Sequence, residues 1–219
     1  MFSRGLIIFI LLSGALYARD DIQAWQWMDL RVFEFKKHKV NLHFENWIAD
    51  DVKEEKLLLA AVRYKNEFHR LLQLGVHYSY LDIRNLVTDE WSYHQRLEFE
   101  FNPRANVHGQ LAFMLRNRLE YRWYEATNRD ENFRSRHRPQ FTYFTKGKVL
   151  TKLFANSELF IDYEKDKLNE FRTIPIGAGF KLLPKLNLNT FYMIQSKRPS
   201  TSRDWQHNHI LGTHLIYRF

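Results

Sequence analysis

The sequence contains no cysteine among its 219 residues. This absence excludes a disulfide framework and thiol chemistry. Long apolar runs are also missing, since no segment beyond the N-terminal region approaches the roughly 18 apolar residues that mark a membrane-spanning helix. We therefore exclude a helical membrane protein. Glycine-rich loops of the kind that cradle phosphate groups are absent as well.

The first residues have the three parts of a secretory signal. A basic start ends at Arg4, an apolar run covers residues 5–12, and small residues follow as far as Ala18. The apolar run is too short to cross about 30 Å of hydrocarbon as a helix. Cleavage after Ala15 or Ala18 satisfies the small-residue rule, and we favour Ala18. We expect a signal peptide over residues 1–18 and one domain over residues 19–219.

The composition is unusual for a water-soluble domain, because aromatic residues reach 16% while the mean hydropathy is −0.50. A barrel with lipid outside and water inside explains both values, because apolar and polar residues then alternate along each strand. The net charge of +8 would suit nucleic acid, but a signal peptide directs the chain out of the cytoplasm. We expect no nucleic-acid partner. A basic barrel would instead meet outer-membrane lipid and anionic lipopolysaccharide.

Alternation with a period of two runs through almost the whole chain, in segments of about ten residues or more. Such alternation places each set of residues on one face of a strand. The candidate strands lie at 25–36, 39–49, 56–65, 68–81, 90–102, 106–123, 132–146, 151–163, 170–182, 185–196 and 205–219. We predict an all-β fold, a transmembrane antiparallel up-and-down β-barrel of 10 to 12 strands.

The predicted connections alternate between tight turns and longer polar loops. The tight set covers 36–39, 102–106, 146–148 and 183–185, and the longer set covers 50–55, 82–90, 125–132 and 197–204. In outer-membrane barrels the short turns are periplasmic, so an even count of ten or twelve strands is expected. The first segment breaks phase at Met28 and Phe33, so it is either a wall strand or a lead-in within the lumen. Helical spacing within 53–75 leaves a helix as an alternative to two strands.

The polar face is richest in charge in the middle of the chain. An arginine facing lipid at the membrane midplane would cost about 2–4 kcal/mol, whereas cross-strand pairs of opposite charge contribute only about 0.2–1 kcal/mol each. We therefore place this face in the lumen and expect Glu120 to lie near Arg134, Arg136 or Arg138. The predicted charged ladder consists of Arg96, Glu98, Glu100, Arg116, Arg118, Glu120, Arg122, Arg134, Arg136, Arg138, Glu158 and Asp162.

This ladder has two interpretations. The guanidinium and carboxylate groups could interlock and fill a narrow lumen. Alternatively, an arginine-lined wall could favour the passage or binding of anions. The first is favoured, because ten or twelve strands leave little room inside.

The chain ends with alternating apolar residues on one face of the last predicted strand. Leu215, Tyr217 and the terminal Phe219 resemble the C-terminal signal that the outer-membrane assembly machinery reads. Aromatic pairs such as Tyr121 and Trp123 recur toward the strand ends, as in the aromatic girdles at the two membrane interfaces. We expect the mature protein in the outer membrane of a Gram-negative bacterium, with the assembly machinery as a partner.

Several runs resemble the bacterial domain-of-unknown-function 2490 family. They are RNRLEYRWYE from Arg116, FRSRHRPQFTY from Phe133, FANSELF from Phe154, the stretch 172–180 with its two glycines, and the closing YRF. The resemblance implies an outer-membrane barrel that spans nearly the whole mature chain. It carries no established activity, so no catalytic residue follows from it.

Catalytic and metal-binding patterns are weak. Ser92 and His94, with Glu90, would be needed for a lipid hydrolase, but the sequence gives no sign of a hydrogen-bonded relay. His207 and His209 face opposite to His214 in a regular strand, so they do not form a convergent ligand set. We expect no catalytic residue, metal or cofactor. A lipid hydrolase and a scaffold that binds an envelope partner through its loops are the alternative functions.

Overall fold

The protein is described by a computed structural model that covers residues 21–124, 131–163, 167–198 and 205–219. Within these ranges every regular element is a strand, and no helix is long and apolar enough to cross a membrane. The predicted signal peptide and its cleavage site lie outside the described residues. The strands are β1 (Asp21–Phe35), β2 (His38–Ala49), β3 (Glu54–His69), β4 (Leu72–Asn85), β5 (Glu90–His108), β6 (Leu111–Tyr124), β7 (Asn132–Phe144), β8 (Leu150–Asp162), β9 (Lys167–Leu183), β10 (Leu186–Lys197) and β11 (Gln206–Arg218).

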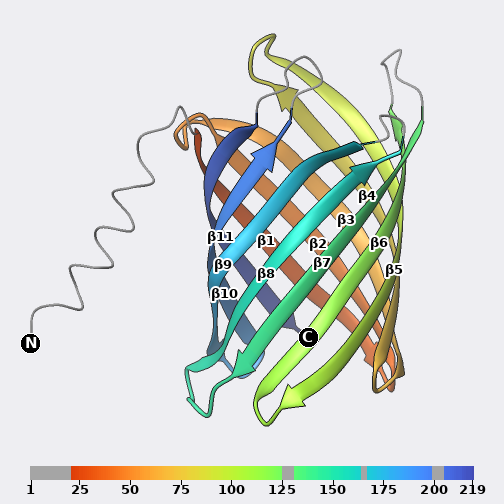
Figure 1. The fold of residues 1–219 in the computed structure, drawn as a ribbon, viewed down its shortest axis with the longest axis vertical. Helices are drawn as coiled ribbons and strands as arrows, with labels where there is room; N and C mark the ends of the chain where they lie inside the picture. Colours follow the sequence, from red (N-terminus) through yellow and green to blue (C-terminus); the bar gives the residue numbers. More distant parts are fainter. Residues whose placement is uncertain (1–20, 125–130, 164–166, 199–204) are drawn as a thin grey trace, which may run out of the picture.

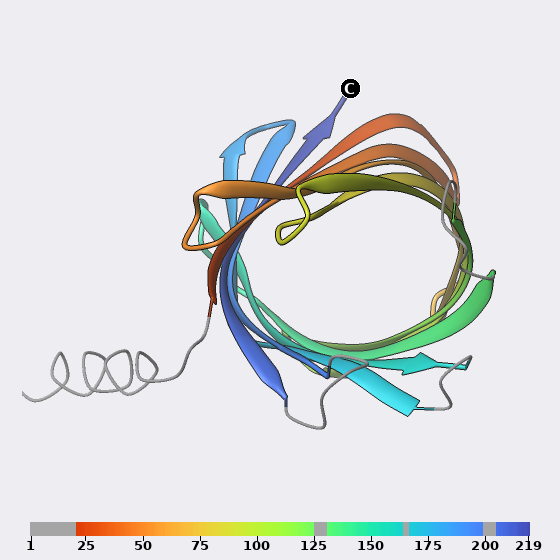
Figure 2. The same ribbon diagram turned by 90° about the horizontal axis from the view of Figure 1, so that it is seen from above.

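The strands form one closed barrel in chain order (Figures 1 and 2). Each strand pairs antiparallel with its neighbours in the chain, and β1 closes the ring against β11. Closure leaves no unpaired sheet edge, which removes the usual route to edge-to-edge aggregation. The predicted all-β barrel is confirmed, with a strand number inside the expected range.

The expected even count was wrong, because the barrel has eleven strands and its closing pair is parallel. The parallel register runs from Asp21 beside Asn208 to Arg31 beside Arg218. The first segment is therefore a wall strand rather than a lumenal lead-in. Its phase break has a local cause: the pairing of β1 with β2 shifts between Arg31 and Phe33, as at a β-bulge. A bulge adds one residue and reverses the alternation beyond it.

The strand boundaries decide one alternative and correct one expectation. Within residues 53–75 the two predicted strands are confirmed, as β3 and the start of β4 with a turn at residues 70–71, and the helical alternative is wrong. The turn expected at 102–106 lies instead at residues 109–110, because β5 continues to His108. Gly109 adopts a φ of +51° in that turn, a conformation that glycine reaches without steric cost.

The two ends of the barrel differ in their connections. At one end, which we call the short-turn end, four of the five connections have two residues each, at 36–37, 70–71, 109–110 and 184–185. At the other, the long-loop end, the connections are 50–53, 86–89, 125–131, 163–166 and 198–205. In Figure 1 the short-turn end lies at the bottom, together with the C-terminus. This difference between the ends was predicted from the spacing of the turn residues.

The outer face of the barrel is largely apolar. Along each strand the residues that point outward alternate with those that point into the lumen. Large apolar side chains are exposed on most strands, among them Phe44, Val62, Tyr78, Phe99, Leu119, Phe133, Leu159, Ile176 and Leu211. Among the aromatic pairs singled out in the sequence, Phe99 and Phe101 are about half exposed, as are Phe141 and Tyr143. Polar and charged side chains are buried on the opposite face.

Candidate functional site in the lumen

The charged ladder lies on the inward face of β5 to β8, which we call the charged wall. Its strand register places like charges opposite one another. Arg116 pairs with Arg138 and Arg118 with Arg136 in the β6–β7 register, while Glu98 pairs with Glu120 between β5 and β6. Like charges directly opposite are destabilising, so the side chains must lean diagonally to meet a partner of opposite sign. Several ion pairs of the ladder are accordingly diagonal, such as that of Arg136 with Glu120. Two others join residues directly opposite in the register, Arg134 with Glu120 and Arg118 with Glu100.

Glu120 is the centre of this network. Its Oε2 accepts hydrogen bonds from Nε of Arg134 at 2.8 Å and from Nη2 of Arg122 at 3.0 Å. Its Oε1 accepts one from Nη1 of Arg136 at 2.8 Å. The Glu120 side chain is 0% exposed. A buried carboxylate with three guanidinium partners is compensated, whereas the same carboxylate alone would be strongly unfavourable. The structure thus brings Glu120 against two of the three arginines named from the sequence.

Two other groups of carboxylates continue the network on either side. Arg118 lies 2.8 Å from Oε2 of Glu98 and 2.7 Å from Oε1 of Glu100. On β8, Glu158 accepts hydrogen bonds from Arg136, with Nε 3.0 Å from Oε1 and Nη2 3.1 Å from Oε2, and it also pairs with Arg116. The two bonds from Arg136 form a bidentate pair, the stronger arrangement for arginine and carboxylate. Contacts therefore run without a break across β5, β6, β7 and β8.

Three members of the predicted ladder lie in the lumen without joining this network. Arg96 and Arg138 make no ion pair among the described residues, and the Nε of each is buried without a hydrogen-bond partner. Asp162 lies at the end of β8 and accepts a hydrogen bond from Asn169 at 3.1 Å. The inward position of these three residues was predictable from the alternation. Whether each forms an ion pair depends on the strand register and on side-chain reach, which the alternation does not give.

The opposite side of the lumen, on β1 to β3 and β9 to β11, carries clusters of buried aromatic and aliphatic side chains among polar ones, and we call it the aromatic wall. Trp25 and Trp47 stack with their ring centroids 3.7 Å apart. Trp25 also packs in a buried cluster with Ile174, Phe191, Met193 and Ile210. The sequence analysis did not identify this wall, because it considered aromatic residues only as candidates for the membrane interfaces. The signal was present: in the first strand Trp25 and Trp27 share a face with Asp29 and Arg31.

Arg172 of β9 joins the two walls. Its guanidinium carbon lies 4.9 Å from the ring centroid of Trp25, 5.2 Å from that of Trp47 and 4.6 Å from that of Phe160. Phe160, on β8, also has the guanidinium groups of Arg134 and Arg136 over its ring, at 4.8 and 4.6 Å. Cation–π contacts of this kind contribute about 2 kcal/mol or more when water is excluded. The contacts of Arg172 extend across the lumen, because Trp47 and Phe160 lie on well-separated strands of the ring.

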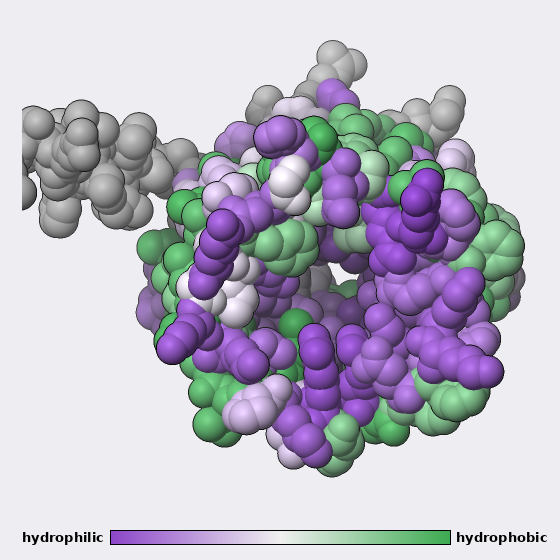
Figure 3. Space-filling view, turned by 90° about the horizontal axis from the view of Figure 1, so that it is seen from below, coloured by the Kyte–Doolittle hydropathy of each residue, from purple (hydrophilic) through white to green (hydrophobic). Residues whose placement is uncertain are grey.

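Side chains fill much of the lumen at this level. The space among the ladder residues is a cavity of about 360 Å³, and a second cavity of about 290 Å³ lies toward the short-turn end. Seen from that end, hydrophilic side chains surround the opening and leave a narrow gap near its centre (Figure 3). The arrangement is a constriction built from paired charges.

Comparison with known protein families adds one finding. A family model described as a protein of unknown function, DUF2490, matches residues 22–207. The chain belongs to this family. The matched part extends from the first strand into the last one, so the DUF2490 region covers nearly the whole barrel, as the resemblance in the sequence implied. No curated protein and no solved structure matches the chain.

The C-terminal residues of this DUF2490 barrel end the parallel closing strand. Leu215 and Tyr217 lie on its outward face, and the rings of Tyr217 and Phe219 meet edge to face with centroids 5.0 Å apart. Phe219 is 70% exposed. The predicted assembly signal is therefore accessible from outside the barrel wall at the short-turn end.

Ser92 and His94 are in contact, which the sequence did not indicate. The Oγ of Ser92 lies 3.0 Å from Nε2 of His94 and 3.2 Å from the carbonyl oxygen of Ile83. If the hydroxyl donates its one hydrogen to Ile83, His94 must donate to Ser92 and cannot act as its base. Glu90, the acid considered from the sequence, accepts a hydrogen bond from Thr88 instead.

The three C-terminal histidines diverge, as the alternation predicted. His207 contacts Ser196 and His209 stacks on Tyr192, whereas His214 points into the lumen and contacts Asp29 at 2.8 Å. Asp29 also contacts Nδ1 of His43 at 2.7 Å. The ligand atoms of these last three lie within 4.8 Å of one another, so they could hold a divalent metal ion. The same groups are already satisfied by their mutual hydrogen bonds.

Proposed function

We propose that this protein is an integral outer-membrane barrel whose lumen is closed to the free passage of solutes by its own charged wall. The distribution of side chains supports the membrane placement. The barrel exposes phenylalanine, leucine, valine and tyrosine around its circumference and buries most glutamates and arginines of the charged wall inside. Exposed apolar surface of this extent is rare on soluble monomers and typical of a surface that meets lipid or another protein.

Polar groups on the outer face support the same proposal, because several of them pair with one another. Nδ1 of His137 lies 2.9 Å from Oδ1 of Asn117, and Nε2 of His137 lies 3.2 Å from Oγ of Ser135. Ser135 also accepts a hydrogen bond from the hydroxyl of Tyr163 at 3.1 Å. Polar groups that face hydrocarbon must be satisfied internally, since no water is available there. This cluster meets that requirement on the barrel surface itself.

The orientation we propose follows the connections: the short-turn end faces the periplasm and the long-loop end faces the outside. Residues 1–18 would be removed during export, and Leu215, Tyr217 and Phe219 would be recognised by the assembly machinery. The basic net charge would favour contact with lipopolysaccharide. A simple test is gel mobility of the outer-membrane fraction, heated and unheated. A heat-dependent shift in that fraction is expected, and a soluble periplasmic protein would contradict the placement.

One observation carries the proposal of a closed lumen. Glu120 is inaccessible to solvent in the middle of the barrel, with arginines from β6 and β7 around it. In an open aqueous channel these charged groups would be exposed to water. Interlocked pairs instead satisfy one another, as expected for a filled barrel of small diameter. The barrel would then serve the envelope as a structural or loop-presenting element.

Conductance across a planar bilayer tests closure. The wild-type protein is expected to give no ohmic steps, and Arg136→Ala, which removes the group between Glu120 and Glu158, is expected to give measurable conductance. Lys148→Gln, in the exposed connection between β7 and β8, serves as the matched control and is expected to stay silent. Regular ohmic steps with anion preference from the wild-type protein would contradict a closed lumen and would indicate a narrow pore instead.

Hydrolysis of lipid is a second candidate, favoured only by the 3.0 Å contact between Ser92 and His94. Both residues point into the lumen near the long-loop end, so a lipid would have to enter the barrel to reach them. Phospholipid turnover by purified protein that disappears in Ser92→Ala would support this activity. Equal phospholipid turnover in the wild type and in Ser92→Ala would exclude hydrolysis at Ser92.

A further inference from the structure

The cavity toward the short-turn end, which we call the basic cavity, has a volume of about 290 Å³. This is far more than the roughly 10–15 Å³ that one water molecule requires. Its lining includes five lysine or arginine side chains, Arg31, Lys39, Lys65, Arg138 and Lys152, but only two carboxylates, Asp29 and Glu67. The cavity therefore has a surplus of positive charge.

Both carboxylates already have partners. Asp29 receives hydrogen bonds from His43 at 2.7 Å and from His214 at 2.8 Å. Glu67 lies 3.2 Å from Nζ of Lys39, receives a hydrogen bond from Gln73 at 2.9 Å, and pairs with Arg104. Arg31 pairs with Glu34, outside the cavity lining, at 2.9 Å. Neither cavity carboxylate is paired with the three cations that remain. The surplus positive charge of the cavity therefore lies on these three side chains.

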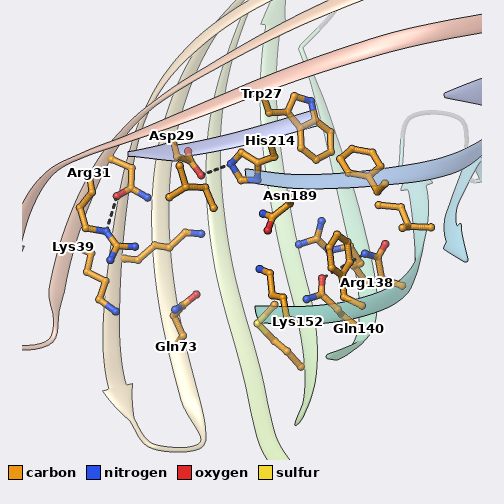
Figure 4. Close-up of a pocket in the computed structure, with 18 of the residues that line it drawn as sticks. Trp27, Asp29, Arg31, Lys39, Gln73, Arg138, Gln140, Lys152, Asn189 and His214 are labelled. Carbon is orange, nitrogen blue, oxygen red and sulfur yellow. Dashed lines mark hydrogen bonds and ion pairs between the residues drawn. The ribbon is translucent and has the colours of Figure 1, made fainter. Parts of the chain in front are cut away.

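Those three cations are Lys65 on β3, Arg138 on β7 and Lys152 on β8. In the part of the chain that the structure describes, none of them forms an ion pair with a carboxylate. The Nε of Arg138 is buried and has no hydrogen-bond partner. The ammonium of Lys152 lies 5.6 Å from the ring centroid of Phe154. Figure 4 shows Arg138, Lys152 and Gln140 on one side of the cavity, with Arg31 and Lys39 on the other.

Cations that have no ion-pair partner and face a cavity are unfavourable unless water or an anion solvates them. We propose that the basic cavity binds a small tetrahedral oxyanion of the phosphate type, held by Lys65, Arg138 and Lys152. Arginine offers a fork of donors to two oxygens, and each lysine provides a point charge. A divalent anion would neutralise two of the three charges. Amide donors nearby, from Asn156 and Gln140, lie in the same lining.

The cavity lies at the short-turn end of the constriction, so the anion would enter from that end. The enclosed lumen would admit a free small anion more readily than a phosphoryl group carried on a lipid or polymer. Binding requires only that the short-turn end be accessible, so it would occur in a closed or a conducting barrel. If phosphate does not bind, the proposal of a closed lumen is therefore unaffected. If the barrel conducts ions, the proposal of an anion site is likewise unaffected.

Tryptophan fluorescence gives a direct test, because Trp27 lines the cavity. The purified barrel in zwitterionic detergent would be titrated with sodium phosphate, with sodium chloride adjusted to keep ionic strength constant. Saturable phosphate binding is expected, with the stoichiometry measured by calorimetry. A signal that depends on ionic strength alone, or no binding at all, would overturn the proposal.

Two lysines of β3 provide a matched pair of variants. Lys65→Gln removes a cation of the cavity and is expected to weaken phosphate binding by about tenfold or more, as for loss of a charge-assisted hydrogen bond. Lys56→Gln removes the same charge from the same strand near the long-loop end, and Lys56 is not part of the cavity lining. Its affinity for phosphate is expected to equal that of wild type.

Arg138→Gln and Lys152→Gln extend the test to the other two strands, with folding checked by heat-modifiable gel mobility. Each is expected to weaken binding by about tenfold or more. If one variant fails to fold, the other carries the test. Wild-type affinity in the folded cavity variants would exclude the site. An equal loss of affinity in Lys56→Gln would show that the net charge of the barrel attracts phosphate, and it would also exclude the site.

Discussion

The two walls of the lumen both fill the interior of the barrel with side chains, but they do so with different interactions. The charged wall on β5 to β8 places several like charges opposite one another in its register and relies on ion pairs that converge on Glu120 and Glu158. The aromatic wall packs Trp25, Trp47 and their neighbours as a small hydrophobic core. One wall depends on every partner being present, whereas the other depends on shape. Substitutions in the two walls should therefore differ in size and kind.

The largest effect is expected at the centre of the charged wall. Glu120→Ala removes the shared partner of Arg122, Arg134 and Arg136, and it leaves these cations with less compensation. Breaking a buried pair in this way costs about 3–5 kcal/mol. Urea unfolding of the protein in lipid vesicles would measure the loss. Asp162→Asn, at a carboxylate outside the network, should cost clearly less, and an equal loss would weaken the distinction between network and isolated charge.

The outer face next to this network gives the second prediction. Leu119 precedes Glu120 and points outward, where its side chain is 42% exposed. In the proposed membrane placement, Leu119→Arg would bring a charge into hydrocarbon, at a cost of about 2–4 kcal/mol near the midplane. Val87→Arg, in the connection between β4 and β5, is the control, because Val87 is 93% exposed outside the strands. Equal unfolding free energies for the two variants would contradict a lipid-facing Leu119.

Shape is tested on the aromatic wall by adding a single methyl group. The ring of Phe191 lies over Gly212, and a Cβ there would come within 2.0 Å of Phe191 Cζ. Gly212→Ala should cost about 1–3 kcal/mol, as for overpacking of a well-packed core. At Gly75 on β4 the nearest atom to such a Cβ is 3.0 Å away. Gly75→Ala should therefore unfold at a higher urea concentration than Gly212→Ala, and the opposite order would refute the packing argument.

The smallest effect is expected where the walls meet. Trp25→Phe keeps an aromatic ring but reduces its stack on Trp47 and its contact with Arg172. A loss of about 0.5–1.5 kcal/mol is expected from the aromatic pair. Indole fluorescence would report the packing, and urea unfolding the stability. A loss as large as that of Glu120→Ala would mean that the aromatic wall is as sensitive to single changes as the charged one.

Much of the barrel could be predicted because a strand has a period of two. The residues of the charged wall, Arg116, Arg118, Glu120 and Arg122 among them, alternate so regularly that their common face followed from spacing alone. The same regularity separated the short turns from the longer connections. Composition and alternation therefore carried the fold class and the position of the charged face.

Other features depend on how distant strands meet, and spacing does not contain that information. The odd number of strands goes with the parallel pairing of β1 with β11, which lie at opposite ends of the chain. The inward position of Trp25 and Trp47 was hidden because tryptophan suits either a membrane interface or a core. The contacts of Arg172, and the absence of an ion-pair partner for Arg138 among the described residues, depend on side-chain reach across the lumen.

The parallel seam between β1 and β11 has a consequence for the ends of the described chain. Since both strands run in the same direction, residue 21 lies at the long-loop end and Phe219 at the short-turn end. A linker that joined residue 21 directly to Phe219 would have to traverse the height of the wall, so a short linker would not suffice. A circular permutant built on residues 21–219 would therefore need a long tether.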